Sequence, residues 1–112
     1  MNEKEKILLE NLTEYLETAE EAFEKSKFNS AVTLFFKAIS AGADLFLLKK
    51  EGSVPSSHAN RFRILEEKHA ELYDILDKDF PFYQDSYTKK MDKESAEVLK
   101  EDALKVKKMS TE

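Results

Sequence analysis

The stretch AVTLFFKAISAGADLFLL, residues 31–48, decides the fold of this chain. Its apolar residues fall on two stripes at spacings of three and four, so a helix built from it is apolar on most sides. Such a helix is typical of the buried centre of a helical bundle. Lys37, Ser40 and Asp44 lie inside it nonetheless. Together with Thr33 they recur at spacings of four, three and four, which predicts one narrow polar stripe along the apolar helix.

The charged members of this stripe need partners from elsewhere in the chain. Lys37 and Asp44 are two turns apart, about 10 Å along a helix axis, so they cannot bond to each other directly. The stripe either faces solvent or a gap between helices, or it lines a cleft for a dimer partner or a ligand. In the second case we expect Asp44→Ala to change oligomeric state or ligand affinity more than the overall fold.

Length and composition indicate one all-α domain over residues 1–112. There are only two glycines and two prolines to interrupt long helices, and no cysteine for disulfides, thiolate zinc sites or nucleophilic catalysis. An intracellular, cytoplasmic setting is the default. The start of the chain, MNEKEKILLENL, lacks the pattern of an export signal. Each charge in the 31–48 stretch would cost roughly 2.5 to 3.5 kcal/mol at a bilayer centre, so no membrane span is expected.

Capping residues divide the chain into helices. Asn2 caps a first helix that ends near Lys25, Asn29 or Ser30 caps the second, and Gly52 ends it. Ser57 begins a segment to residue 79 that is one helix, or two with a kink near His69. Pro81 is expected to end it and to start a short helix, and Asp92 caps the last helix, with residues 108–112 frayed. We therefore predict an antiparallel up-and-down four-helix bundle with an additional short helix.

The two histidines restrict the possible chemistry. Neither His58 nor His69 has a second histidine one turn away, so neither a metal site nor a cofactor is expected. Arg63 and His69 form a candidate RNA-cleaving pair, with His69 as general acid or base and Arg63 steadying a phosphate. Residues six apart on a helix point about 120° apart, so this pair needs a kink or a dimer cleft to converge.

Aromatic and basic residues gather in the segment DFPFYQDSYTKK, residues 79–90. Tyr83 and Tyr87, followed by Lys89 and Lys90, have the composition of a base-stacking surface beside phosphate-binding cations. An ordinary contact between residues four apart explains the two tyrosines equally well. The net charge of −5 argues against a broad phosphate-binding surface, although a local basic patch is compatible with it.

From Phe28 onward, about three-quarters of the chain, the sequence resembles the HEPN domains of prokaryotes. The matching features are the aromatic-rich KFNSAVTLFFKAISAGADLFLLKKEG, the loop made by Pro55, Ser57 and His58, and the Ser86-Tyr87 segment before the last helix. The resemblance implies a toxin-type ribonuclease, a partner module for a minimal nucleotidyltransferase, or a nucleotide-binding adaptor, often as a homodimer. Active ribonucleases of that family carry an arginine and a histidine with four to six residues between them in a late helix. Arg63 and His69 fit this spacing but precede the aromatic segment.

We therefore expect a non-catalytic HEPN-like binding module, a homodimer that acts through a protein partner such as a nucleotidyltransferase, or through a nucleotide or RNA. A metal-independent endoribonuclease using Arg63 and His69 and a purely structural helical subunit are the alternatives. The residues expected to line the ligand or partner cleft are Lys37, Ser40, Asp44, His58, Tyr83, Tyr87, Lys89 and Lys90.

Overall fold

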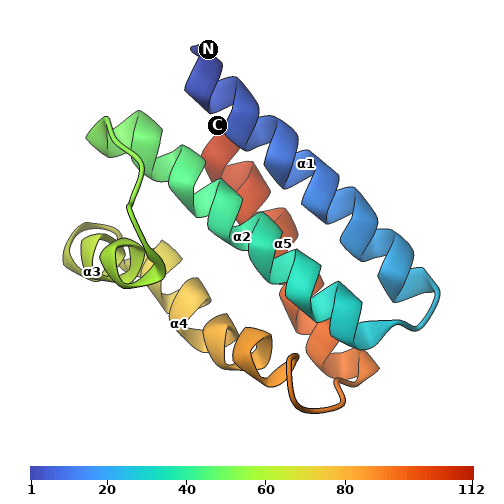
Figure 1. The fold of residues 1–112 in the computed structure, drawn as a ribbon. Helices are drawn as coiled ribbons and strands as arrows, with labels where there is room; N and C mark the ends of the chain where they lie inside the picture. Colours follow the sequence, from blue (N-terminus) through green and yellow to red (C-terminus); the bar gives the residue numbers. More distant parts are fainter.

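The computed structural model describes all of residues 1–112 and contains five α-helices and no strand, which confirms the all-α prediction. The helices are α1 (Glu3–Glu24), α2 (Phe28–Glu51), α3 (His58–Lys68), α4 (Ala70–Asp85) and α5 (Lys93–Thr111). The long helices α1, α2 and α5 run alongside one another, with α2 in contact with both of the others and α5 behind it in the view of Figure 1. The α3 and α4 helices form an arm in which α4 packs against α2 and α5, while α3 packs mainly on α4.

Local capping explains where most of the helices begin. The side chains of Asn2, Ser57 and Asp92 each accept a hydrogen bond from the backbone N–H three residues later, at 2.8, 3.0 and 2.8 Å. These three caps confirm the predicted starts of α1, α3 and α5. Gly52 ends α2 with φ = 85°, a left-handed conformation that glycine adopts without strain, also as predicted.

The predicted cap of α2 is wrong. The helix begins at Phe28 and has no side-chain cap. The Asn29 side chain instead donates to the carbonyl oxygens of Ser86 and Lys89, at 2.9 and 2.6 Å, and accepts from the backbone N–H of Met91 at 3.0 Å. Asn29 therefore ties the start of α2 to the loop between α4 and α5, a role that depends on residues about sixty positions away.

As predicted, α2 is the central helix of the core. By length and composition it is the one helix that can cross a membrane, but 67% of its most apolar window is buried inside the protein. Its buried apolar side chains contact those of α1, α4 and α5 in a single cluster. The largest fully buried side chains of α2 are Val32, Phe35, Phe36, Ile39, Leu45 and Leu47.

Gly42 allows α2 to approach α1 and α5 closely. A Cβ atom at this position would lie 2.7 Å from Cγ1 of Val106 and 3.0 Å from Cδ1 of Leu12. Gly42→Ala should therefore lower the free energy of unfolding by about 1 to 2 kcal/mol, because overpacking of a core outweighs the gain in helix propensity. Urea unfolding measures this difference. In the background of Val106→Ala, which removes the closest methyl group, the penalty should shrink, and an unchanged penalty would contradict the steric explanation.

The segment that begins at Ser57 is two helices, separated at His69 (φ −139°, ψ 71°). The prediction that Pro81 ends the second of them is wrong, because α4 continues through Pro81 to Asp85. Proline deprives the carbonyl of Asp77 of its helical donor. Pro81 and Asp77 are both exposed, so water can hydrate that carbonyl. The short helix of this fold is thus α3, and not a separate helix after Pro81.

The predicted fraying of residues 108–112 is also wrong. The last helix extends to Thr111, and Ser110 is only 1% exposed. The Lys49 ammonium group donates to the Ser110 carbonyl oxygen at 2.8 Å, which satisfies one acceptor in the last turn of α5. Packing against the end of α2 holds this segment in place.

Candidate functional site

Three residues of the polar stripe of α2, Lys37, Ser40 and Asp44, line a pocket of about 240 Å³, which we call the stripe pocket. Five of the predicted site residues meet there, namely Lys37, Ser40, Asp44, His58 and Tyr83. They come from α2, the start of α3 and α4. The rest of the lining consists of Leu8, Asn11 and Tyr15 from α1, and Phe36 and Ala41 from α2. The stripe thus faces an open gap between helices.

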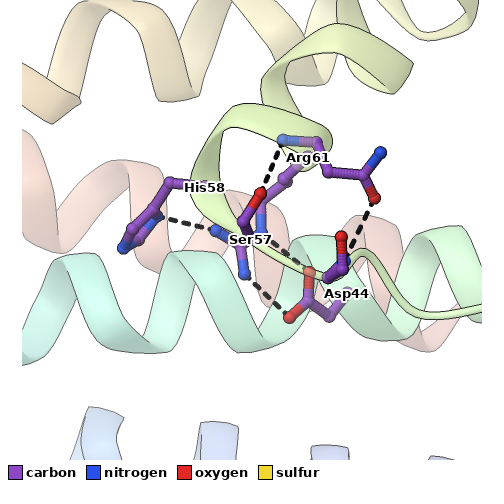
Figure 2. A network of polar contacts seen from close by, with 6 residues as sticks. Asp44, Ser57, His58 and Arg61 are labelled. Atoms are coloured by element: carbon purple, nitrogen blue, oxygen red, sulfur yellow. Dashed lines mark hydrogen bonds and ion pairs between the residues drawn. The ribbon is translucent and has the colours of Figure 1, made fainter.

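Asp44 has its partner on α3. Its carboxylate accepts two hydrogen bonds from Arg61, from Nε at 2.7 Å and from Nη2 at 3.0 Å (Figure 2). The side chains are 13% and 10% exposed respectively. The planar guanidinium matches the carboxylate in this two-point geometry, which is the strong form of an ion pair. The pair fastens the arm to α2.

The same arginine fixes the protonation state of His58. Nη1 of Arg61 lies 2.8 Å from Nδ1 of His58 (Figure 2). A guanidinium group can only donate, so Nδ1 must accept with its lone pair and the ring proton must sit on Nε2. Partial desolvation and the positive charge of Arg61 lower the pKa of His58 below its usual value, although Asp44 opposes this shift. The imidazole is therefore neutral at neutral pH, with Nε2–H as its free donor.

Two polar groups of the stripe pocket have no partner in the protein. Lys37 forms no ion pair and no hydrogen bond, and its ammonium group lies over the ring of Tyr83, 5.9 Å from the centroid. Oγ of Ser40 is buried without a hydrogen-bond partner. Buried polar groups are normally paired, so an unpaired hydroxyl beside an unpaired cation indicates a place where an outside group can bind.

Aromatic rings form one wall of the stripe pocket. Tyr83 stacks on Phe36, with ring centroids 4.8 Å apart and an interplanar angle of 25°. The Tyr83 hydroxyl contacts that of Tyr87 at 2.8 Å, and Tyr87 itself is 66% exposed. Burial and the Tyr87 hydroxyl raise the pKa of Tyr83 to about 12, so this side chain remains a neutral phenol. Tyr87 extends the aromatic surface beyond the pocket.

The other predicted site residues lie elsewhere. Lys89 faces the carboxylate of Asp85 at 3.4 Å, and Lys90 lines a separate hollow beside the loop between α1 and α2. His69 holds the Glu51 carboxylate at 2.9 Å and packs edge-on against Phe46, while Arg63 is exposed on α3. No group of three His, Cys, Asp or Glu side chains is placed to hold a metal ion.

Sequence reasoning missed Arg61, the residue that organises the site. It lies three residues after His58, a spacing that places both on one side of α3. That spacing is the only signal for it in the sequence, and Arg63 fitted the family motif instead. The structure shows that Arg61 is buried and that Arg63 is exposed.

A second cluster of ionisable groups lies outside the stripe pocket, between α4 and α5. Asp79 is fully buried, and neither of its side-chain oxygens accepts a hydrogen bond from a donor in the protein. The carboxyl group of Asp102 lies within hydrogen-bonding reach, and Lys78 contacts Asp102 at 3.0 Å. Burial, followed by the proximity of Asp102, raises the pKa of Asp79 to about 9. Asp79 is therefore protonated at neutral pH.

Comparison with known proteins yields no match to a family model, to a curated protein or to a solved structure. The resemblance to HEPN domains therefore stays a prediction. The stripe pocket is the feature from which a function can be inferred.

Proposed function

We propose that this chain is a non-catalytic, HEPN-like binding module and that its stripe pocket binds a nucleotide. The observation that carries this proposal is the unpaired Lys37 ammonium beside the unpaired Ser40 hydroxyl, next to the stacked rings of Phe36 and Tyr83. Ligand pockets combine an apolar or aromatic lining with a few polar groups that fix orientation. A cation and a donor suit a phosphate group, and an aromatic wall suits a base.

The state of His58 supports binding without catalysis. Its Nδ1 is occupied by Arg61, so only Nε2–H is free, and that group already carries its proton. It cannot accept a proton from a substrate, and giving the proton away would leave an imidazolate anion. General acid or base catalysis needs a group that can do one of these near neutral pH. His58 is therefore a hydrogen-bond donor for a ligand.

The fold and the assembly are part of the same proposal. We infer that α1, α2, α4 and α5 form an antiparallel up-and-down four-helix bundle with α3 as the additional short helix, supported by the contacts of α2 with the other three. The resemblance from Phe28 onward supports a cytoplasmic homodimer with a nucleotidyltransferase as partner. Light scattering of the purified protein and co-purification with its partner test these two points.

Replacement of Lys37 by methionine tests the nucleotide site. We expect Lys37→Met to weaken nucleotide binding roughly 10- to 100-fold, because a charge-assisted hydrogen bond contributes about 1.5 to 3 kcal/mol. Isothermal titration calorimetry measures the affinity. Lys100→Met is the matched control, since Lys100 also lies over an aromatic ring, that of Phe23, but outside the pocket. Equal affinity of both variants and the unchanged protein would contradict the proposed site.

The same preparations separate this proposal from its alternatives. Incubation with RNA in EDTA tests for a metal-independent ribonuclease. Cleavage that His69→Ala abolishes would overturn the non-catalytic proposal in favour of Arg63 and His69. A purely structural subunit would bind no nucleotide and would co-purify with a partner in a fixed ratio.

A further inference from the structure

We infer, on the basis of the nucleotide site proposed above, that the stripe pocket selects nucleotides with a single phosphate group over nucleoside di- and triphosphates. In this arrangement the phosphate is held by Lys37, Ser40 and His58, and the base lies against the aromatic wall. The inference is carried by the charges that line the pocket and by the size of the pocket.

The stripe pocket offers one uncompensated positive charge. Asp44 and Lys37 are the charged residues in its lining, and Asp44 is neutralised by the two-point ion pair with Arg61. The third guanidinium nitrogen of Arg61 donates to His58, so each of the three nitrogens already makes a hydrogen bond within the protein. Lys37 is the one charged donor that is free, and the other donors in the lining, among them Ser40 Oγ–H and His58 Nε2–H, are neutral. One free cation among neutral donors matches one phosphate group.

The surroundings are unfavourable for additional phosphates. The α1 helix contributes only the uncharged residues Leu8, Asn11 and Tyr15 to the lining of the pocket. A second or third phosphate group would find no further cation in the lining of the pocket. Like charges held close together repel, most strongly where water is partly excluded. The chain also lacks a glycine-rich loop of the kind that cradles polyphosphates.

The size of the pocket also favours a ligand with a single phosphate group. Its volume of about 240 Å³ lies just below the usual range of roughly 300 to 1,000 Å³ for small-molecule sites. One phosphate group and part of a nucleoside fill such a space. The polar amide of Asn11, at the α1 side of the lining, is the group that can both donate to and accept from the edge of a base.

Calorimetry with a series of ligands tests this inference. We expect a nucleoside monophosphate or its 3′,5′-cyclic form, tried for each of the common bases in EDTA, to bind at least tenfold more tightly than the triphosphate or the unphosphorylated nucleoside. Lys37→Met should reduce this preference over the nucleoside to less than threefold. Ser40→Ala should weaken binding of the monophosphate about three- to tenfold, and Lys100→Met should leave all of these affinities unchanged.

The outcomes that would overturn the inference are distinct. Tighter binding of the triphosphate would refute the preference for one phosphate while leaving the nucleotide site in place. Binding of inorganic phosphate as tight as that of the best monophosphate would show that the pocket takes free phosphate and that the base contributes nothing. Absence of binding by every ligand would refute the nucleotide site itself, together with this inference.

Discussion

Arg61→Met is expected to lower the free energy of unfolding by about 3 to 5 kcal/mol, because it leaves the Asp44 carboxylate buried without its partner. Methionine keeps the length of the side chain and a good helix propensity, so the loss reports on the missing charge. Denaturant unfolding monitored by circular dichroism measures it. Nδ1 of His58 also loses its donor in this variant.

Two further variants show whether the ion pair is the cause. Asp44→Leu combined with Arg61→Met removes both charges and should recover most of the lost stability, since a buried ion pair can be replaced by apolar side chains at little cost. Lys68→Met breaks the much more exposed pair with Glu51 and should change the free energy of unfolding far less than Arg61→Met does. A double variant no more stable than Arg61→Met would contradict this account.

Asp79→Asn is expected to stabilise the protein at neutral pH by a few kcal/mol. In the folded state the pKa of Asp79 is raised to about 9, whereas in the unfolded chain it is near its ordinary value of 3.8. The stability that comes from this proton is fully present below about pH 4 and is lost as the pH rises toward 9. Asparagine is nearly the same shape, carries no charge at any pH and can donate to Asp102 as the protonated acid does.

The difference in stability between Asp79→Asn and the unchanged protein reports on Asp79 alone, because all other titrating groups are the same in both proteins. The melting temperature of Asp79→Asn should exceed that of the unchanged protein by a margin that grows from pH 4 to pH 9 and then stays constant. Asp77→Asn, an exposed position on the same helix, is the control and should show no such trend. A margin that is independent of pH would show that Asp79 is ionised in the folded protein.

The structure changes one expectation about Asp44. From the sequence, Asp44→Ala was expected to affect oligomeric state or ligand affinity more than the fold. The carboxylate proves to be the partner of a buried guanidinium, so its removal leaves Arg61 unpaired at 8% exposure. We now expect Asp44→Ala to destabilise the fold as well. Lys37, which has no partner in the protein, is the better residue with which to test binding.

The helices and their boundaries follow largely from the sequence because they depend on contacts within four residues. Caps at Asn2, Ser57 and Asp92 and the left-handed stop at Gly52 are local hydrogen-bonding and backbone requirements, and each was predicted correctly. The exceptions have a common cause. Each depends on tertiary packing: Asn29 bonds to a distant loop, Pro81 and the Asp77 carbonyl that loses its helical donor lie on an exposed side of α4, and packing against α2 orders the end of α5.

The sequence by itself therefore determined that the chain is all-helical, that residues 31–48 form its central helix, and that one polar stripe runs along it. Only the tertiary structure decided which residues of other helices contact that stripe. Asp44 and Arg61 are seventeen residues apart, and Asp79 and Asp102 lie on different helices. Helical periodicity states which side of a helix a residue occupies, but the path of the loops and the packing of helices decide which side of another helix it faces. These contacts pair Asp44 with Arg61 and leave Lys37 and Ser40 without partners in the protein. The polar stripe therefore lines a pocket with groups that can bind a ligand.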